Sequence, residues 1–383
     1  MGSTKRVKRL VILGSTGSIG RQTLDILRGQ RRFRVVGLAA GDNLPLLAEQ
    51  VREFRPLMVS CKGESHLDPE PGHPVEYVPM EEMVVSSEAD LIVVGTVGAA
   101  GLFPTLAALK AGKPVALANK EVLVMAGALV KETAARYGGS LLPVDSEHSA
   151  IWQCLLGEAE ASQASVKRLI LTASGGAFRD RSLEELAQVT PEEALRHPTW
   201  SMGPKITVDS ATLMNKGFEV IEAHWLFDCP WDKIEVVLHR ESIVHSLVEF
   251  IDGTLKAQLS LPDMRLPIQY ALTYPERWPS PAPAMDFSIA SRLTFEPLDE
   301  TRYPCLSLAR EAGRAGGTCP AVLNAADEVA VASFLAGRIS FLDLYPAVAD
   351  TLEHHQPIYR PCLEELLEAD RWARDYLTAK LRN

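Results

Sequence analysis

Short apolar runs and amphipathic stretches alternate along the first 150 residues. Buried strands are predicted for continuous apolar runs such as RLVILG, FRVVGLAA, ADLIVVG and PVALA. Helices are predicted between them, for SIGRQTLDILRGQ, NLPLLAEQVREF, GLFPTLAALKAG and KEVLVMAGALVKETAARYG. Apolar strands separated by amphipathic helices are typical of a parallel sheet that is covered on both faces. The pattern therefore predicts an α/β fold with an N-terminal Rossmann-like domain over residues 1–150.

The pattern changes after this region. Strand-like segments with alternation, such as VKRLILTAS, IEVVLH and TLKAQLSL, predict a central α+β domain with an antiparallel or mixed sheet over residues 151–275. Proline-rich sequence indicates a linker over 276–302, and helical spacing over 303–383 predicts a small C-terminal helical domain.

Composition and charge narrow the class of protein. The net charge of −10 argues against a surface that binds nucleic acid or an anionic membrane. No apolar run reaches the roughly 18 residues of a membrane span, and the basic N-terminus leads directly into a strand without a signal-peptide pattern. The six cysteines are dispersed without a CxxC motif, which favours free thiols in a reducing cytoplasm.

A glycine-rich loop follows the first predicted strand. Gly14, Gly17 and Gly20, in GSTGSIG, allow a tight turn and a close approach to a pyrophosphate at a helix N-terminus. The spacing is GxxGxxG rather than GxGxxG, so a plain strand–helix turn is the alternative. Asp42 stands where an acidic residue binds the ribose of NAD and repels the 2′-phosphate of NADP, although Arg21 could offset it. A solvated turn residue is the alternative for Asp42.

Two carboxylates interrupt the apolar stretch LLPVDSEHSAIWQCL. On a strand, Asp145 and Glu147 would point to the same face, where they repel one another unless a cation lies between them. Such hard oxygen ligands suit Mg²⁺ or Mn²⁺ rather than zinc. The alternative is that DSEH caps a helix that begins there.

A dense polar motif spans residues 197–227. Ser210 is a plausible helix N-cap, and Asn215, Lys216 and Glu219 have the spacing to share one helix side, where they could hold a phosphate and a metal. An exposed Lys–Glu pair is the alternative for this side.

Two other stretches carry candidate binding residues. HPTWSMGP has no periodicity and presents Trp200, which indicates a lid that excludes water, or else a core tryptophan. TASGGAF offers Ser174 and a backbone nest for an anion, or else a plain glycine turn.

Taken together, the motifs GSTGSIG, ALANKE, LPVDSEHSAI, TASGGAF, HPTWSMGPKITVDSATLMNKG, LPDMRLPIQYAL and LNAADEVAVASFL resemble one family. That family is 1-deoxy-D-xylulose 5-phosphate reductoisomerase, and the resemblance covers nearly the whole chain. It implies conversion of 1-deoxy-D-xylulose 5-phosphate to 2-C-methyl-D-erythritol 4-phosphate with NADPH, in non-mevalonate isoprenoid biosynthesis. It also implies a homodimer with a phosphorylated sugar as substrate.

The resemblance also assigns roles to residues. It implies that Mg²⁺ or Mn²⁺ is bound by Asp145, Glu147 and Glu219; Glu222 is near, and only the motif chooses between it and Glu219. It implies a substrate-phosphate site of Ser174, Ser210, Asn215 and Lys216, closed by His197 from the lid. Further substrate contacts implied are Lys120, Ser146, Glu147, Glu219 and Trp200, with Met264 on a second facing segment. The catalytic residues implied are Asp145, Glu147, Glu219, Lys120 and His197.

The resemblance also implies which residues bind the cofactor. The pyrophosphate loop implied is Thr16, Gly17, Ser18 and Ile19, and the loop after the second strand contributes Gly41, Asp42 and Asn43. Asn119 and Glu121 are implied near the nicotinamide, and Gly203 as a lid contact. Asp42 departs from the family, which usually has a basic residue there, and this weakens the expectation of NADPH over NADH.

Two alternative functions fit parts of the sequence. A homoserine or semialdehyde dehydrogenase would share the Rossmann-like domain, but a semialdehyde enzyme needs an activated cysteine, and Cys154 has no evident partner. A non-catalytic sugar-phosphate-binding protein would keep the phosphate residues without needing three carboxylates.

Overall fold

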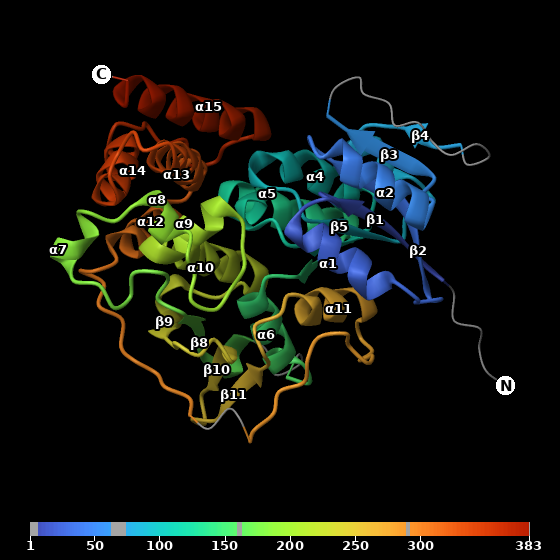
Figure 1. The fold of residues 1–383 in the computed structure, drawn as a ribbon, viewed down its shortest axis with the longest axis horizontal. Coiled ribbons are helices and arrows are strands. Elements are labelled where there is room, and N and C mark those ends of the chain that lie inside the picture. Colours follow the sequence, from blue (N-terminus) through green and yellow to red (C-terminus); the bar gives the residue numbers. More distant parts are fainter. Residues whose placement is uncertain (1–6, 63–73, 159–162, 289–291, 383) are drawn as a thin grey trace. The chain divides into compact units, whose positions relative to one another are not determined.

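The computed structural model describes residues 7–62, 74–158, 163–288 and 292–382 (Figure 1). The chain forms two compact units. The first unit comprises Met1–Val122, Val130–Ser149 and Asp263–Pro283, and the second comprises Leu123–Leu129, Ala150–Pro262 and Ala284–Asn383. Within the described residues, no helix combines the length and apolarity that crossing a membrane requires.

A parallel sheet forms the centre of the first unit. Its strands are β1 (Lys8–Leu13), β2 (Phe33–Ala40), β3 (Met58–Cys61), β4 (Glu76–Tyr77), β5 (Leu91–Val94), β6 (Pro114–Leu117) and β7 (Ser140–Pro143). The order is β4-β3-β2-β1-β5-β6-β7, and every neighbouring pair is parallel. The order reverses between β1 and β5, which is where doubly wound sheets bind nucleotides. The predicted Rossmann-like domain is confirmed.

Helices bury the apolar faces of this sheet. The first unit contains α1 (Ser18–Leu27), α2 (Leu44–Phe54), α3 (Met80–Val85), α4 (Leu102–Lys110), the two ends of α5 (Lys120–Tyr137), the start of α6 (Ser146–Leu155) and α11 (Arg265–Thr273). Ile268, Ala271 and Leu272 of α11 lie in the same apolar core as Leu10 and Leu24, because their spacing places them on one helix face. The first unit therefore takes in residues 263–275, which the sequence assigned to the central domain.

The second unit contains a mixed sheet, as predicted. Its strands are β8 (Val166–Ala173), β9 (Ile234–Leu238), β10 (Val244–Phe250) and β11 (Leu255–Leu259). The order is β11-β10-β8-β9, with β8 and β9 parallel and β10 antiparallel to both of its neighbours.

Helices make up the rest of the second unit. They are α7 (Leu183–Leu186), α8 (Pro191–Ala194), α9 (Pro204–Thr212), α10 (Met214–Phe227), α12 (Pro304–Ala315), α13 (Cys319–Leu335), α14 (Leu344–Glu353) and α15 (Leu363–Lys380). Met214 and Phe218 of α10 share one apolar core with Leu323 and Phe334 of α13. The C-terminal helices therefore belong to the same compact unit as the mixed sheet, and the predicted linker 276–302 is divided between the two units.

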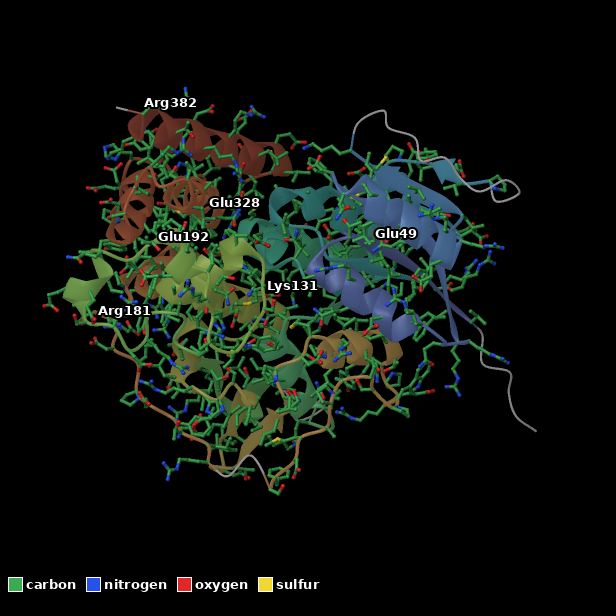
Figure 2. All side chains as sticks on the ribbon, viewed as in Figure 1. Glu49, Lys131, Arg181, Glu192, Glu328 and Arg382 are labelled. Atoms are coloured by element: carbon green, nitrogen blue, oxygen red, sulfur yellow. The ribbon has the colours of Figure 1, made fainter. Side chains whose placement is uncertain are left out.

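Ion pairs add to the packing of the C-terminal helices. Glu328, labelled in Figure 2, lies on α13, and its carboxylate is 2.7 Å from the guanidinium of Arg374 on α15. Arg374 also pairs with Asp370, one turn earlier on α15. These charges lie on the same helices whose apolar faces form the core.

Candidate active site

The glycine loop after β1 has the shape of a pyrophosphate cradle. Gly14 has a φ of +78°, and a Cβ there would lie 2.5 Å from the carbonyl oxygen of Gly95. A Cβ at Gly20 would lie 2.3 Å from the carbonyl oxygen of Gly14, so the first turn of α1 packs directly on the loop. Gly17 is the N-cap of α1 and provides no side-chain cap, which leaves the N-terminus to backbone N–H groups.

The predicted pyrophosphate residues lie together at this point. Thr16 and Gly17 are in the loop, and Ser18 and Ile19 begin α1. The glycine pattern predicted the strand–loop–helix turn that is observed here, whereas the family resemblance assigned these four residues to the pyrophosphate.

The loop after β2 contains the second group of predicted cofactor residues. Gly41, Asp42 and Asn43 follow Ala40, the last residue of the strand. The Asn43 side chain caps α2 by accepting the N–H of Leu46. Asp42 does not form this cap; its carboxylate lies 3.5 Å from the ammonium of Lys62, and its side chain is 83% exposed.

Asn119 is fixed at the start of α5. Its Oδ1 accepts the N–H of Val122 at 3.2 Å, and its Nδ2 donates to Thr96 Oγ1 and to the carbonyl oxygen of Gly98. These bonds set the orientation of the buried amide at the carboxyl end of β6. Glu121 follows in the first turn of the helix.

A buried ion pair joins the carboxyl ends of β6 and β7. The ammonium of Lys120 lies 2.8 Å from Asp145 Oδ2, and the two side chains are 7% and 12% exposed. Lys120 follows β6 and Asp145 follows β7, so the parallel pairing of these strands brings both residues to the same edge.

The prediction of a strand through Asp145 and Glu147 is wrong, because β7 ends at Pro143 and α6 begins at Ser146. Asp145 caps this helix: its Oδ1 accepts the N–H of Glu147, and its carbonyl oxygen accepts that of Ser149. Capping by aspartate favours a helix start over continued strand, so the alternative reading from the sequence is the correct one.

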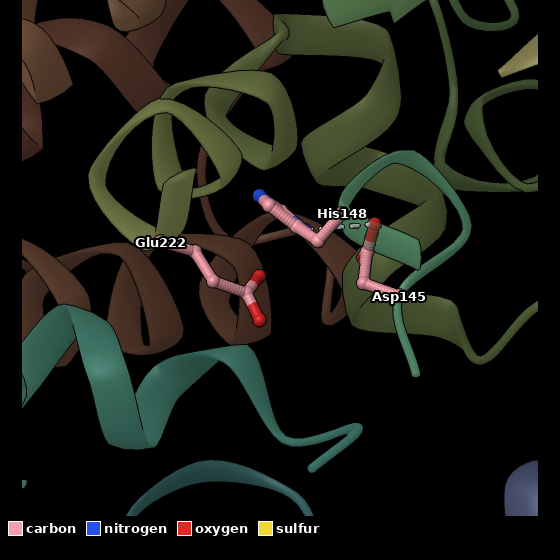
Figure 3. A group of neighbouring side chains, drawn as sticks. All are labelled: Asp145, His148 and Glu222. Atoms are coloured by element: carbon pink, nitrogen blue, oxygen red, sulfur yellow. Dashed lines mark ion pairs between the residues drawn. The ribbon is translucent and has the colours of Figure 1, made fainter. Parts of the chain in front are cut away.

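The first turn of α6 collects polar side chains around Asp145. Ser146 Oγ donates to Glu147 Oε2 at 2.5 Å. His148 is fully buried, and its Nδ1 lies 3.2 Å from Asp145 Oδ1, as the dashed line in Figure 3 marks. His148 is not among the predicted site residues, although its i, i+3 relation to Asp145 on a helix could have indicated it.

Asp145 is held in its ionised form. Burial alone would raise the pKa of its carboxyl, but the Lys120 charge and the His148 hydrogen bond outweigh burial and hold the pKa well below the usual range. A carboxylate at this position is therefore available as a hard oxygen ligand at neutral pH.

In the second unit, a histidine joins two predicted phosphate residues. Ser174 follows β8, and Gly175 and Gly176 after it both have positive φ. His197 Nε2 lies 3.0 Å from Ser174 Oγ and 3.0 Å from Ser210 Oγ. Ser210 lies inside α9, whose N-cap is Gly203, so its prediction as a helix N-cap is wrong. Its hydroxyl is instead turned toward His197.

The hydrogen bonds of His197 identify its tautomer. Nδ1 accepts the backbone N–H of Trp200 at 2.9 Å and that of Thr199 at 3.2 Å, so the proton lies on Nε2. Burial, together with the charge of Arg179, lowers the pKa of His197 to about 4. The ring is therefore neutral near pH 7 and donates from Nε2 toward the serine hydroxyls.

Trp200 follows His197 in the predicted lid. Its indole is partly buried and lies 6.1 Å from the ring of His245, centroid to centroid. Gly203 ends this segment and is exposed. Met264, on the predicted facing segment, is the N-cap residue of α11 in the first unit.

One side of α10 carries three predicted residues, as the spacing indicated. Asn215 Nδ2 donates to Glu219 Oε1 at 2.6 Å, and the Lys216 ammonium contacts Glu219 Oε2. Lys216 and Glu219 are buried, so the alternative of an exposed pair is wrong. Glu222, one turn further along α10, is also buried.

A second buried ion cluster supports α9. The ammonium of Lys205 lies 2.7 Å from Asp209 on the same helix and 2.6 Å from Asp327 on α13. It also lies 4.6 Å from the ring centroid of Phe218. The carboxylates are 3% and 6% exposed, so this cluster fixes the helix that carries Ser210. No sequence pattern links Lys205 to Asp327.

Known proteins are similar to this chain over the segments that carry these residues. Family models match three segments: "1-deoxy-D-xylulose 5-phosphate reductoisomerase" over 10–127, its C-terminal domain over 141–227, and "DXP reductoisomerase C-terminal domain" over 259–376. The reductoisomerase of Pelotomaculum thermopropionicum is 55% identical over 96% of this chain and 97% of its own. The chain belongs to the 1-deoxy-D-xylulose 5-phosphate reductoisomerase family.

Other reductoisomerases agree in sequence and structure. That of Thermosynechococcus vestitus is 53% identical over 97% of this chain and 92% of its own. The Zymomonas mobilis reductoisomerase in complex with NADPH has a TM-score of 0.90 and 42% identity, over 98% of this chain and 99% of that one. A reductoisomerase in complex with NADPH, fosmidomycin and magnesium has a TM-score of 0.89 and 40% identity, over 98% of both chains. A dehydrogenase of the homoserine or semialdehyde type is not favoured.

Proposed function

We propose that the chain converts 1-deoxy-D-xylulose 5-phosphate to 2-C-methyl-D-erythritol 4-phosphate, using NADPH and a divalent metal ion. The observation that carries this proposal is the Lys120–Asp145 pair, which lies beside Ser146 and Glu147 at the carboxyl edge of the sheet that also carries the glycine loop. A reductoisomerase needs both an acidic cluster and a dinucleotide cradle, and family membership supports this assignment.

The glycine loop fits the proposed cofactor. The tight contacts at Gly14 and Gly20 exclude a Cβ at both positions, so no side chain there covers the backbone of the loop. The N-terminus of α1 favours an anion. Thr16, Gly17 and Ser18 would hold the pyrophosphate there, with Asn119 at the nicotinamide side. NADPH, when bound, supplies the hydride for the final reduction.

The acidic residues fit a hard divalent cation. We assign Asp145, Glu147 and Glu219 as ligands of one Mg²⁺ or Mn²⁺, because carboxylate oxygens are the ligands these ions prefer. The low pKa of Asp145 and the bonds that orient Glu219 support the assignment. The ion, when bound, polarises a substrate carbonyl as a Lewis acid.

The second unit supplies the groups for the substrate phosphate. The hydroxyls of Ser174 and Ser210, both bonded to His197, can turn their protons toward an anion. Asn215 and Lys216 add an amide and an ammonium from α10. Binding energy from this remote phosphate would drive ordering of the lid around the reacting carbons.

The remaining groups act on the carbon skeleton. The family's rearrangement breaks one C–C bond of the hydroxy-ketone and forms another, by retro-aldol and aldol steps. The Lys120 ammonium and the Ser146 hydroxyl would orient the substrate oxygens and donate hydrogen bonds to them as charge develops. Trp200 would exclude water from the fragments.

We also propose that the protein works as a homodimer in the cytoplasm. The family expectation supports the dimer. All six cysteines are free, which suits a reducing compartment. Light scattering during size-exclusion chromatography tests the dimer: a mass near 84 kDa, about twice 41.9 kDa, is expected, and a mass near 42 kDa would contradict it.

Oxidation of NADPH, followed at 340 nm, tests the proposed function. Absorbance should fall only when 1-deoxy-D-xylulose 5-phosphate and Mg²⁺ are both present, should stop with EDTA, and should resume with excess Mg²⁺. Binding of the sugar phosphate without oxidation would favour a non-catalytic binding protein. Oxidation with a semialdehyde, but not with the sugar phosphate, would favour the dehydrogenase alternative.

A further inference from the structure

Two opposite charges lie together where β2 and β3 end. The strands pair in parallel, with Ala40 opposite Cys61. Asp42 and Lys62 follow these positions, and the Lys62 ammonium lies 3.5 Å from Asp42 Oδ1. Because parallel strands end at the same edge, this pair shares the edge of the sheet with the glycine loop after β1.

The pair is not explained by local structure or stability. Asn43, rather than Asp42, caps α2. The Asp42 and Lys62 side chains are 83% and 74% exposed. An ion pair that is this exposed to solvent contributes little to the stability of the fold. In dinucleotide-binding sheets, the end of β2 is where the adenosine ribose is recognised: an acidic residue accepts a ribose hydroxyl, and a basic one accommodates a 2′-phosphate. This chain presents both kinds of group there.

We propose that Asp42 and Lys62 jointly determine which nicotinamide cofactor binds. Asp42 accepts the ribose 2′-OH of NADH, and Lys62 binds the 2′-phosphate of NADPH while screening it from Asp42. Because the two charges oppose one another, the chain binds both cofactors, with dissociation constants within about tenfold of each other. The inference rests on the proposed function only in requiring that a nicotinamide dinucleotide binds.

Direct binding measurements separate the two roles. Dissociation constants for NADPH and NADH are measured by isothermal titration calorimetry, without substrate, for the wild type, D42N and K62M. One charge contact in water is worth a factor of about five, and the 2′-phosphate carries about 1.5 to 2 charges, so each variant should change NADPH affinity by roughly 10- to 25-fold.

The expected changes have opposite signs. D42N should bind NADPH more tightly and NADH more weakly. K62M should bind NADPH more weakly and leave NADH within about twofold, and its effect should shrink in high salt. K110M is the matched control: Lys110 is an exposed lysine at the end of α4, before β6 begins, at the opposite edge of the sheet, and neither affinity should change.

Other outcomes would overturn the proposal. Equal changes in the affinities for NADPH and NADH, in D42N or in K62M, would do so. An unchanged NADPH affinity in K62M would also do so, even if replacing Arg21 with alanine (R21A) lowers that affinity. Far-UV circular dichroism confirms that each variant is folded. Turnover of the wild type with substrate and Mg²⁺ tests the proposed function separately. The predicted changes in cofactor affinity can be absent while the enzyme still turns over, and they can be present while it does not.

Discussion

Replacing Lys205 with methionine removes the ammonium shared by two buried carboxylates while keeping most of the side-chain volume. In the folded protein, Lys205 lies 2.7 Å from Asp209 and 2.6 Å from Asp327, whose side chains are 3% and 6% exposed. The variant places both negative charges in a poorly solvated site without this cation. Breaking a buried pair in this way costs about 3–5 kcal/mol.

The lower end of that range applies here. The Lys205 side chain is 27% exposed, so water already screens part of the interaction. We therefore expect K205M to lower the free energy of unfolding by about 3 kcal/mol, which for a unit of this size is roughly 6–12 °C in the unfolding midpoint.

The chain offers a matched control in the same unit. Lys256 lies 2.5 Å from Glu158 and 5.4 Å from the ring centroid of Phe250, as Lys205 lies near Phe218. The Lys256 and Glu158 side chains are 39% and 36% exposed, so K256M should cost at most about 1 kcal/mol. Both variants remove an ammonium that contacts a carboxylate and lies near a phenylalanine ring, but the two partners of Lys205 are buried, whereas Glu158, the partner of Lys256, is 36% exposed.

Calorimetry and urea unfolding measure both variants. The double variant K205M/D327N should be more stable than K205M, since it removes one of the two stranded charges. Equal losses for K205M and K256M, or a double variant less stable than K205M, would refute the reasoning that burial makes the Lys205 cluster important.

Three further predictions concern the proposed site. E219Q should lower kcat at least about a hundredfold at saturating Mg²⁺ with an unchanged circular dichroism spectrum, and near-normal kcat would contradict its role as a ligand. W200A should reduce kcat less than E219Q, since a lid residue does no bond chemistry; steady-state kinetics compares the two. Because the His197 pKa is lowered from 6.5 to about 4, the neutral ring's contribution to stability is complete above pH 6.5 and is lost as the pH falls toward 4. Unfolding midpoints should therefore show the wild type losing stability relative to H197N over that range, and parallel pH curves would contradict this.

The sequence was most informative where local pattern decides structure. The apolar runs of β1, β2 and β5 are buried on both faces, so a parallel sheet could be predicted from periodicity alone. The i, i+3 and i+4 spacing of Asn215, Lys216 and Glu219 likewise predicted their shared helix side. In both cases, neighbours along the chain determine the geometry.

Features that depend on distant partners were not predictable. The helical spacing of α12 to α15 gave no sign that α13 shares a core with α10, because helical spacing does not identify the packing partner. The contact of Lys205 with Asp327 joins residues on two helices far apart in sequence. At Asp145, the apolar approach resembled a strand, and the cap that begins α6 depends on where the aspartate side chain bonds.

Diffraction from crystals grown with Mn²⁺ and collected at the manganese absorption edge tests the central claim most directly. The account predicts one anomalous peak, with oxygen atoms of Asp145, Glu147 and Glu219 all at about 2.1 Å from it. A fully occupied manganese ion elsewhere, or one bound without Glu219, would contradict it.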